Sequence, residues 1–284
     1  MAAIVVVHGV GKQFLGPRSL ASAIVPALTD GIVLGGGPHI PQGAVDVAFY
    51  GHWFRQRHSD DGAVAKGGTH DLHPLERELL AQWWAEAARV APDRVPPPEP
   101  AYTGKAATPR AVQRALHALS RLLPARITER FLLGVLRQVR LYLTDPHVRT
   151  AAQSELAAVV SPETRVVVAH SLGSVIAYET LAARPEWEVA KLVTLGSPLG
   201  VPRLIFDRLV PAPSNGRGAW PGAVRSWTNL NDRHDVVALV KRLAPLFDGG
   251  PLHDVTVDNG WQTHDLLHHL TARETGTAIA EGLE

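Results

Sequence analysis

The segment from Ala169 to Gly173 (AHSLG) has the pattern with the clearest chemical meaning in this chain. An apolar run from Val166 to Ala169 precedes it and is typical of a buried strand, and a helical pattern follows from Leu172 to about Ala183. A serine at a sharp turn between a strand and a helix has an exposed hydroxyl and a strained backbone, as in the G-x-S-x-G nucleophile motif. Here the pattern is A-x-S-x-G, because alanine replaces the first glycine. Ser171 is therefore a candidate nucleophile.

The start of the predicted helix adds a second chemical feature. The first backbone N–H groups of a helix lack partners within the helix and have partial positive charge. The N–H of Leu172 can therefore stabilise an oxyanion that develops beside Ser171. The same serine could instead simply cap the helix, so the rest of the chain must separate these two interpretations.

Alternating strand and helix patterns predict the fold class. Short apolar runs, several of them rich in β-branched residues, predict strands at 4–7, 44–50, 165–169, 188–195, 223–230 and 253–257. Helical patterns lie between or after them at 19–28, 150–160, 172–183, 236–243 and 265–280. Strands separated by helices are typical of α/β proteins with a mostly parallel central sheet that is flanked by helices.

The middle of the chain differs from this alternation. We predict that residues 1–50 and 146–284 form the α/β core and that 51–145 is an inserted, mostly helical cap or lid over one end of the sheet. Residues 51–73 are rich in Gly, His and Asp and predict a loop, whereas helices are predicted at 75–90, 110–122 and 125–143. The last of these helices is amphipathic and basic, and we favour packing of its apolar face over contact with a membrane.

Polar residues follow the predicted strands of the core. His8 and Gly9 come after the first strand, Ser171 after the central one, Asp232 and Asp235 after 223–230, and His264 after 253–257. In open α/β sheets, sites form beyond the carboxyl ends of the strands. The order Ser, Asp, His along the chain is the order that α/β-hydrolases use.

Three motifs together resemble the lipase and esterase branch of the α/β-hydrolase superfamily. These are V-V-H-G at residues 6–9, A-H-S-L-G at 169–173 and G-S-P at 196–198. The resemblance covers residues 1–50 and about 145–270, so it does not reach the insert. It implies an α/β-hydrolase fold and a serine nucleophile, and it does not imply a particular substrate.

The resemblance implies roles for three side chains. Ser171 would be the nucleophile, and His264, at the start of the helix after the last predicted strand, would be its general base. His268 and His269 are competitors about one turn further along that helix. Asp235 would orient the base, because the acid in similar enzymes is often followed by a small apolar pair, here Val-Val. Asp232 remains the alternative acid.

The resemblance also implies an oxyanion hole. Its two N–H donors would be Leu172 and Val10, because a His-Gly pair precedes the second donor in similar enzymes. His8 would then be structural and would brace the turn that includes Gly9, while Gly173 would let the helix approach the sheet.

These features predict a serine hydrolase that cleaves a carboxylic ester through an acyl-enzyme. The expected partner is a small-molecule or lipid ester. A non-catalytic binding protein with the same fold is the main alternative, and an acyltransferase or thioesterase could use the same triad.

The composition of the chain, and two motifs that are incomplete, argue against other functional classes. The net charge is +1 and there is no cysteine, so we expect no nucleic-acid partner and no thiolate chemistry. The Gly-Lys pair after the first strand lacks the other residues of a phosphate-binding loop. His264, Asp265, His268 and His269 lack the usual zinc-site pattern, so no metal or other cofactor is expected. The apolar run at residues 2–7 is too short for a signal peptide, and the default expectation is a soluble cytoplasmic protein.

Overall fold

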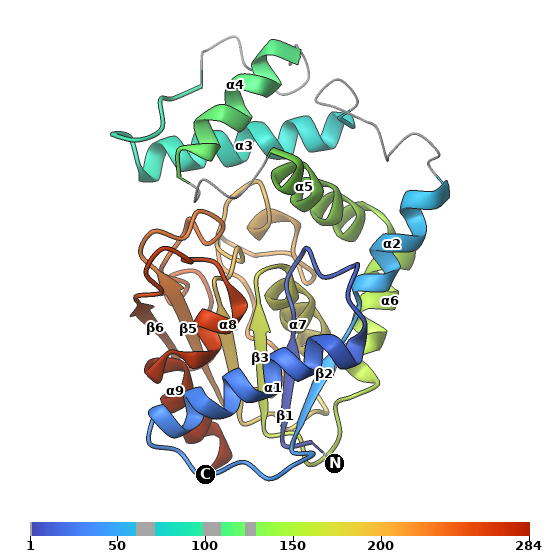
Figure 1. The fold of residues 1–284 in the computed structure, drawn as a ribbon, viewed down its shortest axis with the longest axis vertical. Helices are drawn as coiled ribbons and strands as arrows, with labels where there is room; N and C mark the ends of the chain where they lie inside the picture. Colours follow the sequence, from blue (N-terminus) through green and yellow to red (C-terminus); the bar gives the residue numbers. More distant parts are fainter. Residues whose placement is uncertain (1, 61–71, 99–108, 123–128) are drawn as a thin grey trace. The chain divides into compact units, whose positions relative to one another are not determined.

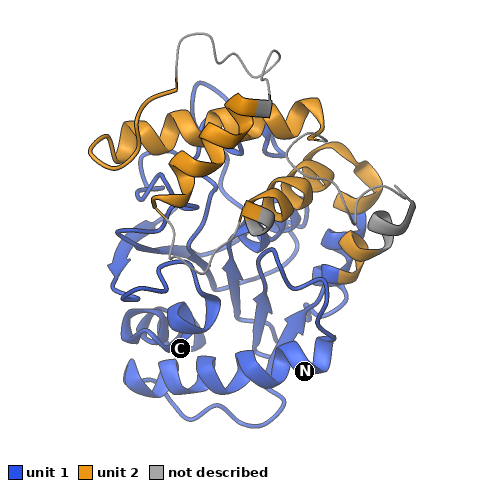
Figure 2. Cartoon of the chain, turned by 45° about the horizontal axis from the view of Figure 1, so that its top comes forward, with its two compact units in different colours: residues 1–51, 150–284 blue, residues 52–149 orange. Residues whose placement is uncertain are grey.

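The computed structural model describes residues 2–60, 72–98, 109–122 and 129–284. The chain divides into two compact units, shown in blue and orange in Figure 2. Unit 1 consists of residues 1–51 and 150–284, and unit 2 consists of residues 52–149. Each unit is described by itself below.

Unit 1 contains a six-stranded sheet in which every pair of neighbouring strands is parallel. The strand order is β2-β1-β3-β4-β5-β6, which places β3 and β4 at the centre (Figure 1). The predicted α/β class with a parallel central sheet is confirmed. The strands are β1 Ile4–Val7, β2 Val45–Ala48, β3 Val166–His170, β4 Lys191–Leu195, β5 Ser226–Asp232 and β6 Leu252–Val257.

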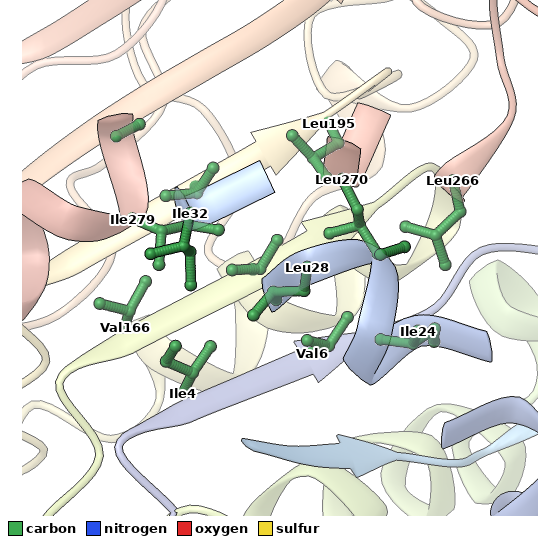
Figure 3. Packing of buried hydrophobic residues seen from close by; sticks show 14 of the residues in the cluster. Ile4, Val6, Ile24, Leu28, Ile32, Val166, Leu195, Leu266, Leu270 and Ile279 are labelled. Atoms are coloured by element: carbon green, nitrogen blue, oxygen red, sulfur yellow. The ribbon is translucent and has the colours of Figure 1, made fainter. Parts of the chain in front are cut away.

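Helices cover both faces of this sheet. Figure 1 shows α1, α8 and α9 in front of the sheet and α7 behind it. The front layer and the sheet enclose an apolar core of aliphatic side chains, seen from close by in Figure 3. The helices concerned are α1 Pro17–Leu34, α7 Leu172–Ala182, α8 Leu266–Thr271 and α9 Arg273–Leu283, with the short 3-10 helix η3 at Phe206–Arg208.

Unit 2 is helical in the part of the chain that is described. One ion pair joins Arg140 Nε of α5 to Glu76 Oε1 of α3 at 2.8 Å, and the Glu76 carboxylate is buried. Trp83 and Trp84 are buried, and the Trp84 indole donates to the carbonyl of Pro96 at 2.8 Å. The helices are α2 Gly51–Asp60, α3 Pro74–Val90, α4 Pro109–Ser120 and α5 Glu129–Thr144, and α6 Pro146–Ala157 leads back into unit 1.

Two predicted elements were wrong. The segment 51–60 was predicted as loop but forms α2. The segment 236–243 was predicted as a helix but has no regular structure, because its backbone bonds to strand side chains instead. Asn231 of β5 donates to the carbonyl of Lys241, and Asp254 of β6 accepts from the N–H groups of Leu243 and Ala244. Residues 125–128 of the predicted helix 125–143 lie outside the described residues.

No helix within the described residues is both long enough and apolar enough to span a membrane.

Candidate active site

Ser171 occupies the turn between β3 and α7 in a strained backbone conformation. Its φ is 54° and its ψ is −129°, a region that residues with a side chain rarely adopt. The backbone is held there by its N–H, which donates to the carbonyl of Leu195 at 3.0 Å. The Ser171 hydroxyl points toward His264 and makes no capping hydrogen bond to the N–H groups of α7. Strain of this kind costs about 1–3 kcal/mol and persists where the surrounding structure enforces it.

A chain of hydrogen bonds fixes the carbonyl of Ser171. Ser174 Oγ donates to that carbonyl at 2.6 Å, and the hydroxyl of Ser197 lies 2.7 Å from Ser174 Oγ. The backbone N–H of Leu199 in turn donates to Ser197 Oγ at 3.3 Å. From the sequence, Ser197 was noted only as part of the G-S-P motif, and Ser174 was assigned no role. The three-residue spacing of Ser171 and Ser174 across the helix start was the sequence feature that could have indicated these hydrogen bonds.

His264 and Asp235 complete a hydrogen-bonded row with the serine. His264 Nε2 lies 3.0 Å from Ser171 Oγ, and His264 Nδ1 lies 2.7 Å from Asp235 Oδ2. The other carboxylate oxygen of Asp235 accepts from the N–H groups of Val237 and Ala238. Both carboxylate oxygens of Asp235 thus accept hydrogen bonds, and the bond to Oδ2 orients the imidazole with Nδ1–H toward Asp235.

The charge state of Asp235 follows from its surroundings. Burial alone would raise the pKa of this carboxyl, but the His264 ring and its hydrogen bond, with Lys241, hold the pKa well below its usual range. Lys241 Nζ also donates to the backbone carbonyl of Asp235 at 2.5 Å. The acid is therefore an anion that can stabilise positive charge on the imidazole.

The alternative residues have other partners. Asp232 accepts from the N–H groups of His234 and Asn259, both at 2.7 Å, and so holds two loops. His268 Nδ1 lies 3.0 Å from Asp265 Oδ1, and the side chain of His269 is fully buried. Of the two aspartates left open by the sequence, Asp235 is the one beside the His264 ring.

The turn after β1 is braced as the sequence indicated for His8. His8 Nδ1 donates to the carbonyl of Gly9 at 2.7 Å, while Nε2 accepts from the N–H of Tyr50 at 3.3 Å. The Tyr50 ring stacks on His8 with centroids 4.1 Å apart, and its hydroxyl donates to the His8 carbonyl at 2.5 Å. Gly9 adjoins Ser171, since a Cβ at Gly9 would lie 2.7 Å from the Cβ of Ser171. Val10 follows directly in this turn.

Gly173 allows α7 to begin against the end of β1. A Cβ at this position would lie 2.3 Å from the carbonyl oxygen of His8 and 2.7 Å from that of Val7. Both atoms belong to the backbone, so neither can move aside at low cost. The small residue at this position of the motif is therefore required by packing.

Replacing Gly173 by alanine should consequently damage both the fold and the site. We expect the free energy of unfolding to fall by at least about 2 kcal/mol, because the overlap is with backbone. Gly134 in α5 is the matched control, because its Cβ would meet nothing within 4 Å. Gly134→Ala should be neutral or stabilise by about 0.5–1 kcal/mol. Urea denaturation measures both variants, and wild-type stability of Gly173→Ala would contradict this packing.

The buried histidines predict an acid-sensitive fold. Burial lowers the pKa of both His8 and His269 from 6.5 to about 4. Because both folded-state values lie below the unfolded value, the unfolded chain binds more protons between about pH 4 and 6.5. The free energy of unfolding therefore has its maximum value above pH 6.5 and falls as the pH drops through this window. At pH 4 the fall is about 3 kcal/mol for each ring.

Urea midpoints measured from pH 7.5 to 4.5 test this prediction. The midpoint of the wild type should fall steadily below pH 6.5, and the slope should be shallower for His269→Leu, which has one fewer buried ring to protonate. A wild-type midpoint that stays constant across the range would show that burial does not lower the pKa of these rings.

The described residues contain no group of three or more His, Cys, Asp or Glu side chains placed to hold a metal ion. Comparison with protein-family models, curated proteins and solved structures gives no match.

Proposed function

We propose that this chain has the α/β-hydrolase fold and is a serine hydrolase that cleaves a carboxylic ester. The observation that supports this most strongly is the row Ser171 Oγ, His264 Nε2, His264 Nδ1 and Asp235 Oδ2, with spacings of 3.0 and 2.7 Å. The three side chains come from positions far apart in the chain and meet at the carboxyl edge of a parallel sheet, where α/β proteins form their sites. Hydrogen bonds of this length are the geometry required of a nucleophile, its base and the group that orients the base.

In the proposed first half-reaction, Ser171 Oγ attacks the ester carbonyl carbon while His264 Nε2 takes the hydroxyl proton. The carbonyl electron pair moves to oxygen, and the N–H groups of Leu172 and Val10 are the proposed donors to that oxyanion. Collapse of the intermediate breaks the bond to the alcohol oxygen, which takes the proton from His264. The products of this half are the free alcohol and an acyl-serine.

Water completes the cycle by the same route. His264 accepts a proton from water, the hydroxide attacks the acyl carbon, and the second intermediate collapses to release the carboxylic acid. The proton returns from His264 to Ser171 Oγ. Throughout, the anionic Asp235 would stabilise the imidazolium without itself taking a proton.

The strained serine favours this function over a non-catalytic binding role. A scaffold that only binds has no use for a φ of 54° at Ser171 or for the hydroxyl chain that fixes its carbonyl. Unfavourable backbone geometry that is enforced by several bonds is typical of functional sites. An acyl acceptor other than water would use the same groups and differ only in the product.

A panel of p-nitrophenyl esters of increasing acyl length tests the proposal. We expect turnover of short to medium chains, weaker turnover of the matched p-nitroanilide, and loss of both in Ser171→Ala. Amide cleavage equal to ester cleavage would overturn the ester assignment, and absence of turnover with every ester would overturn the proposed function.

A further inference from the structure

The side chain of His170 lies where three loops of the candidate site meet. It directly precedes Ser171 in the chain, at the last position of β3. Its Nε2 lies 3.0 Å from the backbone carbonyl oxygen of His264, and the two imidazole rings have centroids 4.7 Å apart. On its other side the ring faces Gly9, where a Cβ would lie 2.7 Å from His170 Nδ1. One buried ring thus contacts the segments that carry the nucleophile, the proposed base and a proposed oxyanion donor.

The hydrogen-bonding role of this ring is fixed. Burial and the neighbouring His264 and His269 rings lower the pKa of His170 well below its usual value, so the ring is neutral and has a single N–H. A carbonyl oxygen can only accept, so the proton must be on Nε2, and Nδ1 is the unprotonated nitrogen against Gly9. His170 is therefore a fixed donor to the His264 carbonyl.

The segment that bears His264 needs such an anchor. It connects β6 to α8 without regular structure, and it includes Gly260 with a φ of 62° and the exposed Trp261. At its start, the N–H of Asn259 donates to Asp232 at 2.7 Å. At its end, the His264 carbonyl accepts from His170. The two bonds tie the start of the segment to β5 and its end to β3.

We propose that His170 is a positioning residue that holds His264 at bonding distance from Ser171. In this role it acts through the backbone carbonyl of His264 and takes no part in proton transfer. The inference rests on the proposed function, because it concerns the geometry of that catalytic row. Its physical basis is that small displacements of a catalytic group have large effects on rate.

Two variants distinguish the effect of the His170 hydrogen-bond donor from the effect of the size of its ring. In His170→Gln the amide Nε2 can occupy the place of the imidazole Nε2 and donate to the same carbonyl. His170→Leu has similar bulk and no donor. His268→Leu on α8 is the control for loss of a nearby histidine, because His268 bonds to Asp265 instead. The measured quantities are kcat and KM for a p-nitrophenyl ester and the second-order rate of labelling by a fluorophosphonate.

His170→Leu should lower kcat and the labelling rate by about tenfold to a hundredfold with little change in KM. His170→Gln should restore both to within about threefold of the wild type, and His268→Leu should match the wild type. Equal losses in the Leu and Gln variants, or wild-type rates in His170→Leu, would overturn the positioning role. If the wild type itself neither labels nor turns over esters, the proposed function fails, and this result is distinct from failure of the positioning role alone.

Discussion

Ser171→Ala should lower kcat for ester hydrolysis by about a millionfold, because removal of the nucleophile leaves only substrate binding and the oxyanion donors. KM should change little, since the lost hydroxyl acts mainly in the transition state. The free energy of unfolding should stay close to that of the wild type, because the backbone bonds that fix this turn do not involve the hydroxyl. Progress curves at high enzyme concentration give the residual rate of the variant. Intact mass measurement first shows that the sample contains no wild-type enzyme.

The exposed Ser22 of α1 provides the matched control for this loss. Its hydroxyl bonds only within the first turns of the helix, to the carbonyl of Ser19, so Ser22→Ala should keep wild-type kcat. Residual activity of more than about one per cent in Ser171→Ala would identify another nucleophile, since loss of the attacking group leaves far less than this in known serine hydrolases.

Asp235→Asn should have the second largest effect, a fall in kcat of about ten-thousandfold. The amide that replaces the carboxylate can donate a hydrogen bond to Nδ1 and so favours the wrong imidazole tautomer. It also removes the negative charge that would stabilise the imidazolium. Steady-state kinetics with the same ester, at the same pH for the wild type and the variant, would measure this loss.

Asp232→Asn is the matched comparison, because it makes the same chemical change three residues away. Asp232 holds the backbone of His234 and Asn259 and does not contact the His264 ring. We expect a loss in kcat of less than about tenfold and a fall in the free energy of unfolding of about 1–3 kcal/mol, because one buried backbone donor faces an amide N–H₂. A larger kinetic loss in Asp232→Asn than in Asp235→Asn would reverse the assignment of the acid.

The centre of the sheet could be predicted from the sequence because β1, β3 and β4 are buried on both faces. The central strands are continuous apolar runs, such as Val166 to Ala169, and such runs have few alternative structures. The stretch 236–243 was mispredicted because side chains of two strands bond to its last residues: Asn231 of β5 donates to the Lys241 carbonyl, and Asp254 of β6 accepts from the Leu243 N–H. Local pattern contains no information on such partners. The helix at 51–60 was missed because its composition is polar and its helical periodicity is weak.

The candidate site could be predicted only in part. Ser171 and His264 were indicated by their positions at strand ends, and Asp235 by the resemblance. No pattern in the sequence indicated His170, Ser174 or Lys241, because each of these side chains bonds to a backbone carbonyl. The predicted placement of 51–145 over the sheet concerns the two units together and stays a prediction.

Labelling with a fluorophosphonate, followed by intact mass measurement and peptide mapping, tests the central claim most directly. The claim predicts one adduct per chain, on Ser171, and loss of that adduct in both Ser171→Ala and His264→Ala. The adduct should form in the native protein and not in the urea-unfolded chain. A native protein that takes up no label, or an adduct that persists in Ser171→Ala, would contradict it.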